Sequence, residues 1–192
     1  MTKDAARELR TRILDEAAKL FDTKGIKFTM DDLARSLGMS KKTIYTVFKD
    51  KRSIMIETID RFFDDALADE QEIVNNEYFT IPDKLMAIIS LVPDRYTNND
   101  LRQLHVLKEK YPAVYKHWKK CRDKYWEAIE SLLVQGIEEG SLRYVSIPIF
   151  KTMFRSTIEQ FFQRDVLVKN GISYKEALAD VAYILVNGIT AK

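Results

Sequence analysis

Residues 29–48 read TMDDLARSLGMSKKTIYTVF, and this stretch predicts two short helices close together. Thr29 is a good N-cap residue, and the two aspartates after it lie in the first helical turn, where the helix dipole favours negative charge. Gly38 ends this helix directly after its last apolar residue. Ser40 is a second N-cap and begins a helix over residues 41–48. The pattern is that of a helix-turn-helix.

A longer helix precedes this motif, and another follows it. The first helix has apolar residues at helical spacing, carries Arg10 and other charged residues on the opposite face, and ends at Gly25, the usual residue for a left-handed cap. A fourth helix is expected over about residues 52–72. The motif and the first helix together predict an N-terminal three-helix domain over residues 1–50.

The rest of the chain, residues 51–192, is predicted to be a helical C-terminal domain. Its four prolines lie near helix starts or just past helix ends, because proline lacks the N–H that a helix interior needs. Only 6 glycines and 4 prolines in 192 residues leave little material for hairpin turns, so we predict an all-α fold of about nine helices. The further helices are expected at residues 82–95, 99–109, 112–139, 147–169 and 173–190.

Charge is distributed unevenly along the chain. The total of 31 Lys and Arg against 29 Asp and Glu gives a formal net charge of only +2. Residues 1–52, however, hold 13 basic and 8 acidic residues, a balance of +5, and the remainder has a balance of −3. A basic segment beside an acidic body is typical of a protein with a separate module that binds a polyanion.

Several classes of protein are excluded by missing motifs. The single cysteine, Cys121, rules out an intrachain disulfide and a zinc site built on cysteines. The chain has no Gly-rich phosphate loop, no serine nucleophile elbow and no Glu three residues before a histidine. We therefore expect no enzyme activity, no metal and no cofactor. Neither a signal peptide nor a long apolar window is present, so a cytoplasmic protein without a membrane segment is expected.

The second short helix carries side chains suited to contacts with DNA. Lys can donate hydrogen bonds to guanine acceptors in the major groove, and Thr can contact a phosphate or a thymine methyl group. Lys51, at the start of the fourth helix, is placed to contact the flanking DNA backbone. The other candidate residues lie near the helix N-terminus, whose N–H groups favour phosphate, and away from its apolar face: Lys41, Lys42, Thr43 and Thr46.

A longer pattern runs through about residues 9–56. Its members are Ile13, Ala17, Phe21, Gly25, Thr29, Leu33, Ala34, Gly38, Ser40, Thr43, Ile44, Tyr45, Phe48, Lys51 and Ile54. This pattern resembles the signature of the tetracycline-repressor (TetR) family of bacterial transcriptional regulators. Beyond residue 56 the likeness is one of layout only, and it includes residues 135–140 at the end of the seventh helix.

The resemblance implies a function and a set of contacts. Similar proteins are all-helical homodimers whose three-helix domain binds a palindromic operator in double-stranded DNA, while the C-terminal domain dimerises and binds a small molecule. We therefore expect a ligand-responsive repressor that a small hydrophobic effector releases from DNA. The implied roles are phosphate contact by Thr29, capping by Ser40, contacts with base edges or nearby phosphates by Lys41, Lys42 and Thr43, and backbone contacts by Tyr45 and Lys51.

Two positions depart from the usual pattern. Lys42 stands where similar proteins often have Gly or Pro, and Val47 stands where they often have His or Tyr. Val47 cannot donate a hydrogen bond, so one backbone contact of such repressors is missing unless Lys42 or Lys49 replaces it.

The last two predicted helices are apolar over more than one face. At 100° per residue, the apolar residues of 149–168 cover roughly 220° of the helix, and those of 177–189 cover about 200°. Such helices need partners on two sides, and a second copy of the pair would close a four-helix bundle. Alternatively, both helices lie at the centre of a monomer. The residues expected in the dimer interface are Ile158, Phe161, Phe162, Val181, Leu185 and Gly188.

The body is rich in aromatic residues, which either pack a core or line a ligand site. Amphipathic Trp and Tyr next to an Arg would suit a mostly apolar site with a few polar anchors. The acidic balance of the body slightly favours neutral or cationic hydrophobic ligands. The candidate ligand-binding residues are Phe62, Phe63, Met86, Ile89, Trp118, Arg122, Tyr125, Trp126 and Phe154.

Two alternatives to ligand regulation stay open. Cys121 lies beside Lys119, Lys120 and Arg122, and neighbouring cations favour a reactive thiolate, so a redox sensor is one alternative to a small, partly buried hydrophobe. The other alternative is a helical DNA-binding protein without small-molecule regulation, for which a tightly packed body without a ligand site is expected.

Overall fold

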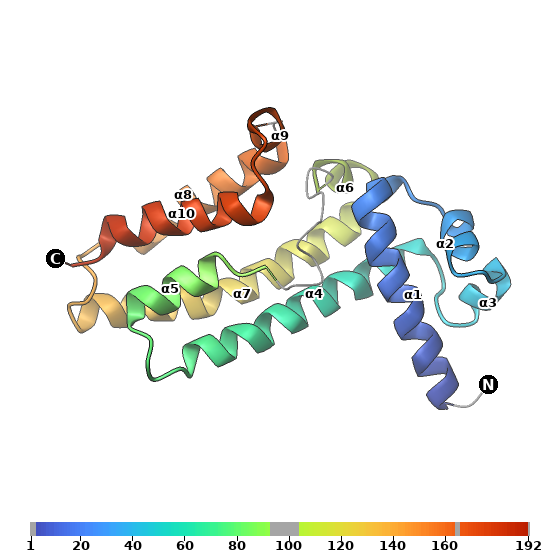
Figure 1. Ribbon diagram of the computed structural model, residues 1–192, viewed down its shortest axis with the longest axis horizontal. Helices are drawn as coiled ribbons and strands as arrows, with labels where there is room; N and C mark the ends of the chain where they lie inside the picture. The colour runs from blue at the N-terminus through green and yellow to red at the C-terminus, as the bar shows by residue number, and fades with distance from the viewer. Residues whose placement is uncertain (1–2, 93–103, 164–165, 192) are drawn as a thin grey trace. The chain divides into compact units, whose positions relative to one another are not determined.

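The computed structural model describes residues 3–92, 104–163 and 166–191, apart from the side chains of residues 22, 104, 105, 162, 163 and 168. Within these ranges the chain is helical, and the only strand-like pairing is an isolated bridge between Leu142 and Thr190 (Figure 1). The predicted all-α fold is confirmed. The helices are α1 (Lys3–Lys24), the 3-10 helix η1 (Gly25–Lys27), α2 (Met30–Ser36), α3 (Lys41–Tyr45), α4 (Lys51–Val74), α5 (Ile81–Ile89), α6 (Leu104–Lys110), α7 (Pro112–Glu138), α8 (Ile147–Gln163), α9 (Val166–Asn170) and α10 (Tyr174–Ile189).

The chain forms two compact units. Unit 1 consists of Met1–Phe62 and Asn98–Lys120, and unit 2 consists of Phe63–Thr97 and Cys121–Lys192. The divisions after Phe62 and after Lys120 fall inside the long helices α4 and α7, so each of these helices contributes residues to both units. The domain division predicted at residue 50 lies at the end of the helix-turn-helix motif, whereas the two units are defined by compactness. The predicted division stays a prediction.

Unit 1 is built around the helix-turn-helix. Helix α1 ends at Gly25 and α2 ends before Gly38, and both glycines adopt a positive φ (58° and 63°), as the sequence predicts. Thr29 and Ser40 are the N-caps of α2 and α3. The buried residues that join α1, α2, α3 and the start of α4 into one core are Ile13, Leu14, Ala17, Leu20, Phe28, Leu33, Ala34, Ile44, Phe48 and Ile54.

Two features of unit 1 differ from the sequence predictions. Helix α3 ends at Tyr45 rather than at residue 48, because the next N–H groups form tighter bonds, with Thr46 N donating to Thr43 O and Val47 N to Ile44 O. Arg10 does not lie opposite the apolar face of α1. Its guanidinium stands 4.5 Å from the centre of the buried Phe48 ring.

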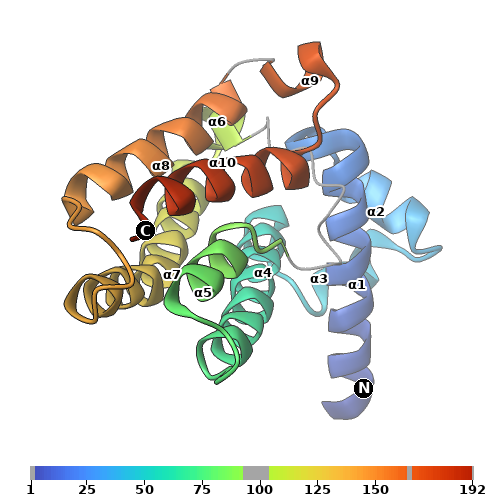
Figure 2. The same ribbon diagram turned by 60° about the vertical axis from the view of Figure 1, so that its left-hand side comes forward.

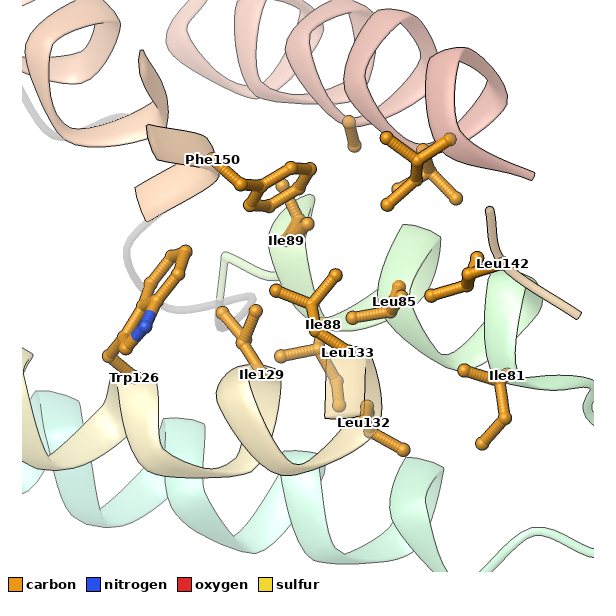
Figure 3. Packing of buried hydrophobic residues seen from close by; sticks show 13 residues of the cluster. Ile81, Leu85, Ile88, Ile89, Trp126, Ile129, Leu132, Leu133, Leu142 and Phe150 are labelled. Carbon is orange, nitrogen blue, oxygen red and sulfur yellow. The ribbon is translucent and has the colours of Figure 1, made fainter. Parts of the chain in front are cut away.

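Unit 2 has its own hydrophobic core, which α5, α7, α8 and α10 share. Helix α5 lies beside α10 (Figure 2), and Phe150 of α8 points toward the isoleucines of α5 and α7 (Figure 3). The buried members are Ile81, Leu85, Ile88, Ile89, Trp126, Ile129, Leu132, Leu133, Leu142, Phe150, Ala182, Val186 and Ile189. Each of the four helices thus presents an apolar stripe to one shared interior.

Gly136 allows the end of α7 to pack closely against its surroundings. A Cβ atom at this position would lie 2.6 Å from Leu142 Cδ1 and 2.9 Å from Ile81 Cγ2. The chain after α7 returns to α10, where the Arg143 N–H donates to Ile189 O at 2.8 Å. Gly136 therefore has a packing role that its place in a helix interior would not suggest.

Two helix starts, one in each unit, agree with the positions of prolines. Pro82 lies in the first turn of α5 and Pro112 begins α7, as proline's missing N–H allows. The predicted helix over 147–169 corresponds to α8 and α9, with residues 164–165 outside the described ranges. Over the described residues, every helix is too short or too polar to cross a lipid bilayer.

Candidate functional site

The polar side of α3 is open within unit 1. Lys42 and Thr46 are exposed, and 49% of Tyr45 is accessible, whereas Ile44 on the other side of the helix is fully buried. Thr43 is half-buried, and its carbonyl accepts a hydrogen bond from Thr46 Oγ1 at 2.7 Å. The helix therefore presents basic, hydroxyl and phenolic groups on a short framework whose apolar side is fixed in the core.

Thr29 and Ser40, both expected near DNA, have capping bonds in unit 1. Thr29 Oγ1 accepts from the Asp32 N–H at 3.1 Å, and the Asp32 carboxylate accepts from the Thr29 N–H at 2.8 Å. Lys24 and these Thr29 bonds hold the pKa of Asp32 well below its usual range. Ser40 Oγ accepts from the Thr43 N–H at 3.1 Å, so its predicted capping role is confirmed. Phosphate contact by Thr29 stays a prediction.

Lys41 forms an ion pair that joins the two helices of the motif. Its Nζ lies 2.9 Å from Asp31 Oδ1, in the first turn of α2, and Asp31 raises the pKa of Lys41. Both side chains are largely exposed, and exposed pairs contribute about 0–1 kcal/mol to stability. So weak a pair can exchange for a DNA phosphate or base, and the reading role of Lys41 stays a prediction.

Lys51 has an unexpected place within unit 1. Its ammonium donates hydrogen bonds to the carbonyl oxygens of Ile26 and Phe28 and stands 4.2 Å from the centre of the Phe28 ring. Burial lowers the pKa of Lys51 to about 8, so the group remains mostly charged at neutral pH. Lys51 therefore supports the turn before α2. Its predicted contact with the DNA backbone stays a prediction.

Arg10 and Glu57 support the segment after α3, a role that the sequence pattern did not reveal. The Arg10 guanidinium forms an ion pair with Glu57 of α4 and donates to the Val47 carbonyl oxygen at 3.3 Å. The carboxylate raises the pKa of Arg10. The available signal was the position of Arg10 next to Leu9 at the edge of the apolar stripe, where a long side chain can lie along a hydrophobic surface.

The candidate ligand residues of unit 2 form two aromatic groups. The Phe63 and Tyr125 rings lie 6.4 Å apart, and the Tyr125 hydroxyl donates to Ile88 O at 3.1 Å. The Trp126 ring lies 5.6 Å from Phe154 and 6.4 Å from Phe150. Ile89 is buried and Met86 packs against the same core, so much of this set also stabilises the fold.

The other candidate ligand residues have partners of their own. Arg122 lies 3.4 Å from the Asp123 carboxylate, which Arg155 approaches to 2.5 Å. Phe62 and Trp118 belong to unit 1, where Trp118 stacks on Tyr115 at 5.7 Å. Cys121 is half-buried, and its redox role stays a prediction.

Part of the expected dimer surface is accessible in unit 2. Gly188 is exposed, and a Cβ built there meets nothing within 4 Å, but Leu185 packs against the core, and Ile158, Phe161 and Val181 are half-buried. The side chain of Phe162 lies outside the described residues. The most exposed apolar side chains of α8 and α10 are ones that the prediction omitted: Ile149 (57%), Met153 (53%), Tyr183 (65%) and Ile184 (68%).

Glu70 is a buried charged residue that the sequence pattern did not single out. Only 6% of it is exposed, and its Oε2 atom has no hydrogen-bond partner among the described residues. Burial raises the pKa of Glu70 to about 7. The signal in the sequence was its register, since Glu70 lies seven residues after Phe63 and four after Ala66, on the apolar stripe of α4.

Comparison with known proteins connects this arrangement to a family. Residues 13–58 match the model of "Bacterial regulatory proteins, tetR family". The HTH-type transcriptional regulator YvaF of Bacillus subtilis (strain 168) is 26% identical over 180 residues, which cover 94% of this chain and 95% of that protein. The matched segment runs from the second half of α1 to the beginning of α4 and includes all the candidate DNA-binding residues.

Solved structures share the fold over nearly the whole chain. A transcriptional regulator from Saccharomonospora viridis, determined in complex with choline, has a TM-score of 0.80 at 20% identity and covers 97% of this chain and 100% of its own. The TetR family regulator PfmR from Thermus thermophilus has a TM-score of 0.68 at 22% identity, with 92% and 97% covered. Both of these proteins are named as transcriptional regulators. Residues 13–58 thus carry the DNA-binding segment of the TetR family of bacterial transcriptional regulators, and the chain resembles such regulators over nearly its whole length.

Proposed function

We propose that the protein is a repressor that binds a palindromic operator as a homodimer and is released from it by a small hydrophobic molecule. The observation that carries this proposal is the exposed polar side of α3, mounted on a helix-turn-helix whose caps and core are complete within unit 1. A ligand can release DNA only if it prefers a dimer geometry in which the two α3 helices no longer fit successive major grooves.

The DNA-binding part of the proposal assigns different roles to the residues of α3 and to Thr46 and Lys51, which follow it. Lys41, Lys42 and Thr43 contact base edges or nearby phosphates, while Tyr45, Thr46 and Lys51 contact the backbone. The test is selection of binding sites from random DNA with the wild type and with Lys41→Ala and Thr43→Ala. A reading role requires that the preferred site changes; the same site with uniformly weaker binding assigns these residues to phosphate.

The dimer part rests on apolar side chains that one subunit leaves exposed. Ile149 and Met153 on α8, and Tyr183 and Ile184 on α10, are each more than half accessible. Helices α8 and α10 contact one another, so a second copy of the pair can complete a four-helix bundle. Single subunits rarely leave so many large apolar side chains in water without a partner.

The dimer is tested by mass measurement in solution at micromolar concentration. We expect twice the 22.4 kDa of one chain for the wild type and a shift toward one chain for Ile184→Glu or Met153→Glu. Ile172→Glu is the control, because Ile172 is also exposed but precedes α10 in a loop. A monomeric wild type contradicts the homodimer.

The effector part assigns the ligand to the aromatic residues of the helical body. Phe63, Tyr125 and Trp126 supply large apolar surfaces, and Tyr125 and Trp126 each add one polar atom at the edge of the ring, which suits a small hydrophobic molecule. The test is loss of operator binding on titration with candidate compounds, and choline is a reasonable first compound because the S. viridis structure contains it. If compounds bind to the protein but none of them lowers its affinity for the operator, regulation without a ligand is favoured.

A further inference from the structure

We infer that the Glu70 carboxylate is the counter-ion of a small organic cation, such as a quaternary ammonium compound, that binds within unit 2 beside Phe63 and Tyr125. This inference rests on the proposed function, because it names the chemical class of the effector. It starts from the position of Glu70, whose side chain faces the interior of the unit although it carries a carboxylate.

The register of α4 makes Glu70 part of an apolar stripe. Phe63, Ala66 and Glu70 follow one another at intervals of three and four residues, and they are 7%, 3% and 6% exposed. Ile73 and Val74 continue the same face and pack against the core of unit 2. A stripe with this spacing normally holds only apolar residues, so a carboxylate in it requires a reason other than packing.

The carboxylate lacks the partners that a buried charge needs. Its Oε2 atom has no hydrogen-bond partner in the described part of the chain, and no described Lys, Arg or His forms an ion pair with it. The Tyr125 hydroxyl, which Glu70 influences electrostatically, donates instead to the Ile88 carbonyl oxygen. A buried carboxylate without a partner lowers stability unless a proton or a bound cation neutralises it.

The surroundings of Glu70 suit a cation with apolar groups. Phe63 and Tyr125 present aromatic rings 6.4 Å apart, and aromatic faces attract quaternary ammonium groups. Ala66, a small side chain, lies between Phe63 and Glu70 on α4. We therefore place the positive centre of the compound at the Glu70 carboxylate and its alkyl or aryl groups toward Tyr125, whose hydroxyl the charge of Glu70 influences.

The charge of α4 in unit 2 acts in the same direction. Residues 63–70 contain four acidic residues and no basic one: Asp64, Asp65, Asp69 and Glu70. Burial raises the pKa of the Tyr125 hydroxyl, and the charges of Glu70 and Asp69 raise it further. A negative potential of this kind attracts cations and disfavours carboxylate or phosphate ligands.

The test uses the full-length protein and matched probes. Choline and benzyltrimethylammonium are the cationic probes, and 3,3-dimethylbutan-1-ol is the uncharged isostere of choline. We expect at least one cation to raise the thermal unfolding midpoint of the wild type in a saturable manner, and the isostere to leave it unchanged. The inference is overturned if neither cation shifts the midpoint, or if the isostere shifts it as strongly as choline does.

Two variants connect the probe to Glu70. Glu70→Gln keeps the shape of the side chain and removes the charge, so we expect the Kd of the bound cation to rise by about tenfold or more. Glu72→Gln is the control, because it removes an exposed charge from the same helix and should leave the Kd within about twofold. An equal Kd in the wild type and Glu70→Gln overturns the inference, and Glu70→Gln can be checked for folding by its own unfolding midpoint.

Operator binding distinguishes this inference from the proposed function. If a cation binds in a Glu70-dependent manner but leaves operator affinity unchanged, the result supports the cation site and contradicts ligand-induced release from the operator. If an uncharged compound releases the operator while the cations do not bind, release stands and the role of Glu70 fails.

Discussion

The two units differ in whether their charged side chains have bonding partners. In unit 1 the charged and polar groups of the motif bond to one another or to backbone: Lys51 reaches two carbonyl oxygens, Arg10 reaches Glu57, and Asp32 completes a capping box. In unit 2 a carboxylate lies inside the apolar face of α4 without such bonds. The first arrangement stabilises the helix-turn-helix, and the second lowers stability at the position where we propose that a cation binds.

The largest expected effect tests the cost of burying Glu70. Above pH 7, Glu70→Gln should increase the free energy of unfolding, by up to about 3 kcal/mol if the pKa of Glu70 rises from 4.5 to about 7 on folding. The sign follows because the folded state binds the proton more tightly than the unfolded state, so wild-type stability falls as pH rises from about 4.5 to 7. Urea unfolding at several pH values measures the difference, which should vanish below about pH 4.5. If the free energies of unfolding of the wild type and Glu70→Gln differ by the same amount at every pH, burial of the charge is not the cause of the difference.

The second effect has the opposite sign, in unit 1. Lys51→Met should lower the free energy of unfolding by about 1–3 kcal/mol, because it leaves the carbonyl oxygens of Ile26 and Phe28 without their donor. Urea unfolding measures the loss. Lys49→Met is the matched control, since Lys49 is exposed and its loss should change stability by at most about 0.5 kcal/mol.

The same pair of variants separates structure from DNA contact at Lys51. If Lys51 also contacts a phosphate, operator affinity should depend less steeply on salt in Lys51→Met, by about one unit of slope. An unchanged slope together with lower stability would leave Lys51 only its structural role. Equal stability of Lys51→Met and Lys49→Met would contradict the structural role.

Sequence predicted the local signals of the fold well and the long-range partners poorly. Thr29, Ser40 and Gly38 determine helix ends through bonds within a few residues, so their roles could be read directly from the motif. The partners of Arg10 and Lys51 lie between 23 and 47 residues away, and no local pattern indicates such contacts. The sequence predicts a DNA contact for Lys51 because it lies close to the second helix of the motif and no nearby residue indicates another partner.

The candidate site in unit 2 shows the same limit. The wide apolar arcs of the last two helices predicted exposed apolar surface, but the residues selected for the dimer interface are not the most exposed apolar ones, because exposure depends on how each helix rotates against its neighbours. Leu185 packs against the core of unit 2, whereas Tyr183 and Ile184 are exposed to solvent. Glu70 could have been found from its register, since a charge on an apolar stripe is visible in the sequence.

A smaller effect tests how rigidly unit 1 holds its reading helix. Ser40→Ala should lower the free energy of unfolding by about 1 kcal/mol, because the Thr43 N–H loses its side-chain acceptor at the start of α3. Operator affinity should fall as well, since α3 has only five residues and begins at this cap. Urea unfolding and operator titration measure the two effects. Ser36→Ala is the control, because it keeps both caps and removes only an exposed hydroxyl that donates to Glu16; equal losses of operator affinity in the two variants would contradict a special role for the cap.

The smallest effect on stability concerns the ion pair between Lys41 and Asp31. Asp31→Asn should change the free energy of unfolding by less than about 0.5 kcal/mol, because both side chains are largely exposed. Operator affinity should nevertheless rise, since the substitution frees Lys41 from its carboxylate and removes one negative charge from the DNA-facing unit. Asp50→Asn removes an equal charge at an exposed position without an ion pair to Lys41, and it separates the general effect of charge from the release of this lysine. If Lys41 contacts DNA, operator affinity should rise more in Asp31→Asn than in Asp50→Asn, and the difference should disappear when Lys41→Ala is added. Equal rises in affinity would mean that the ion pair of Lys41 does not influence DNA binding.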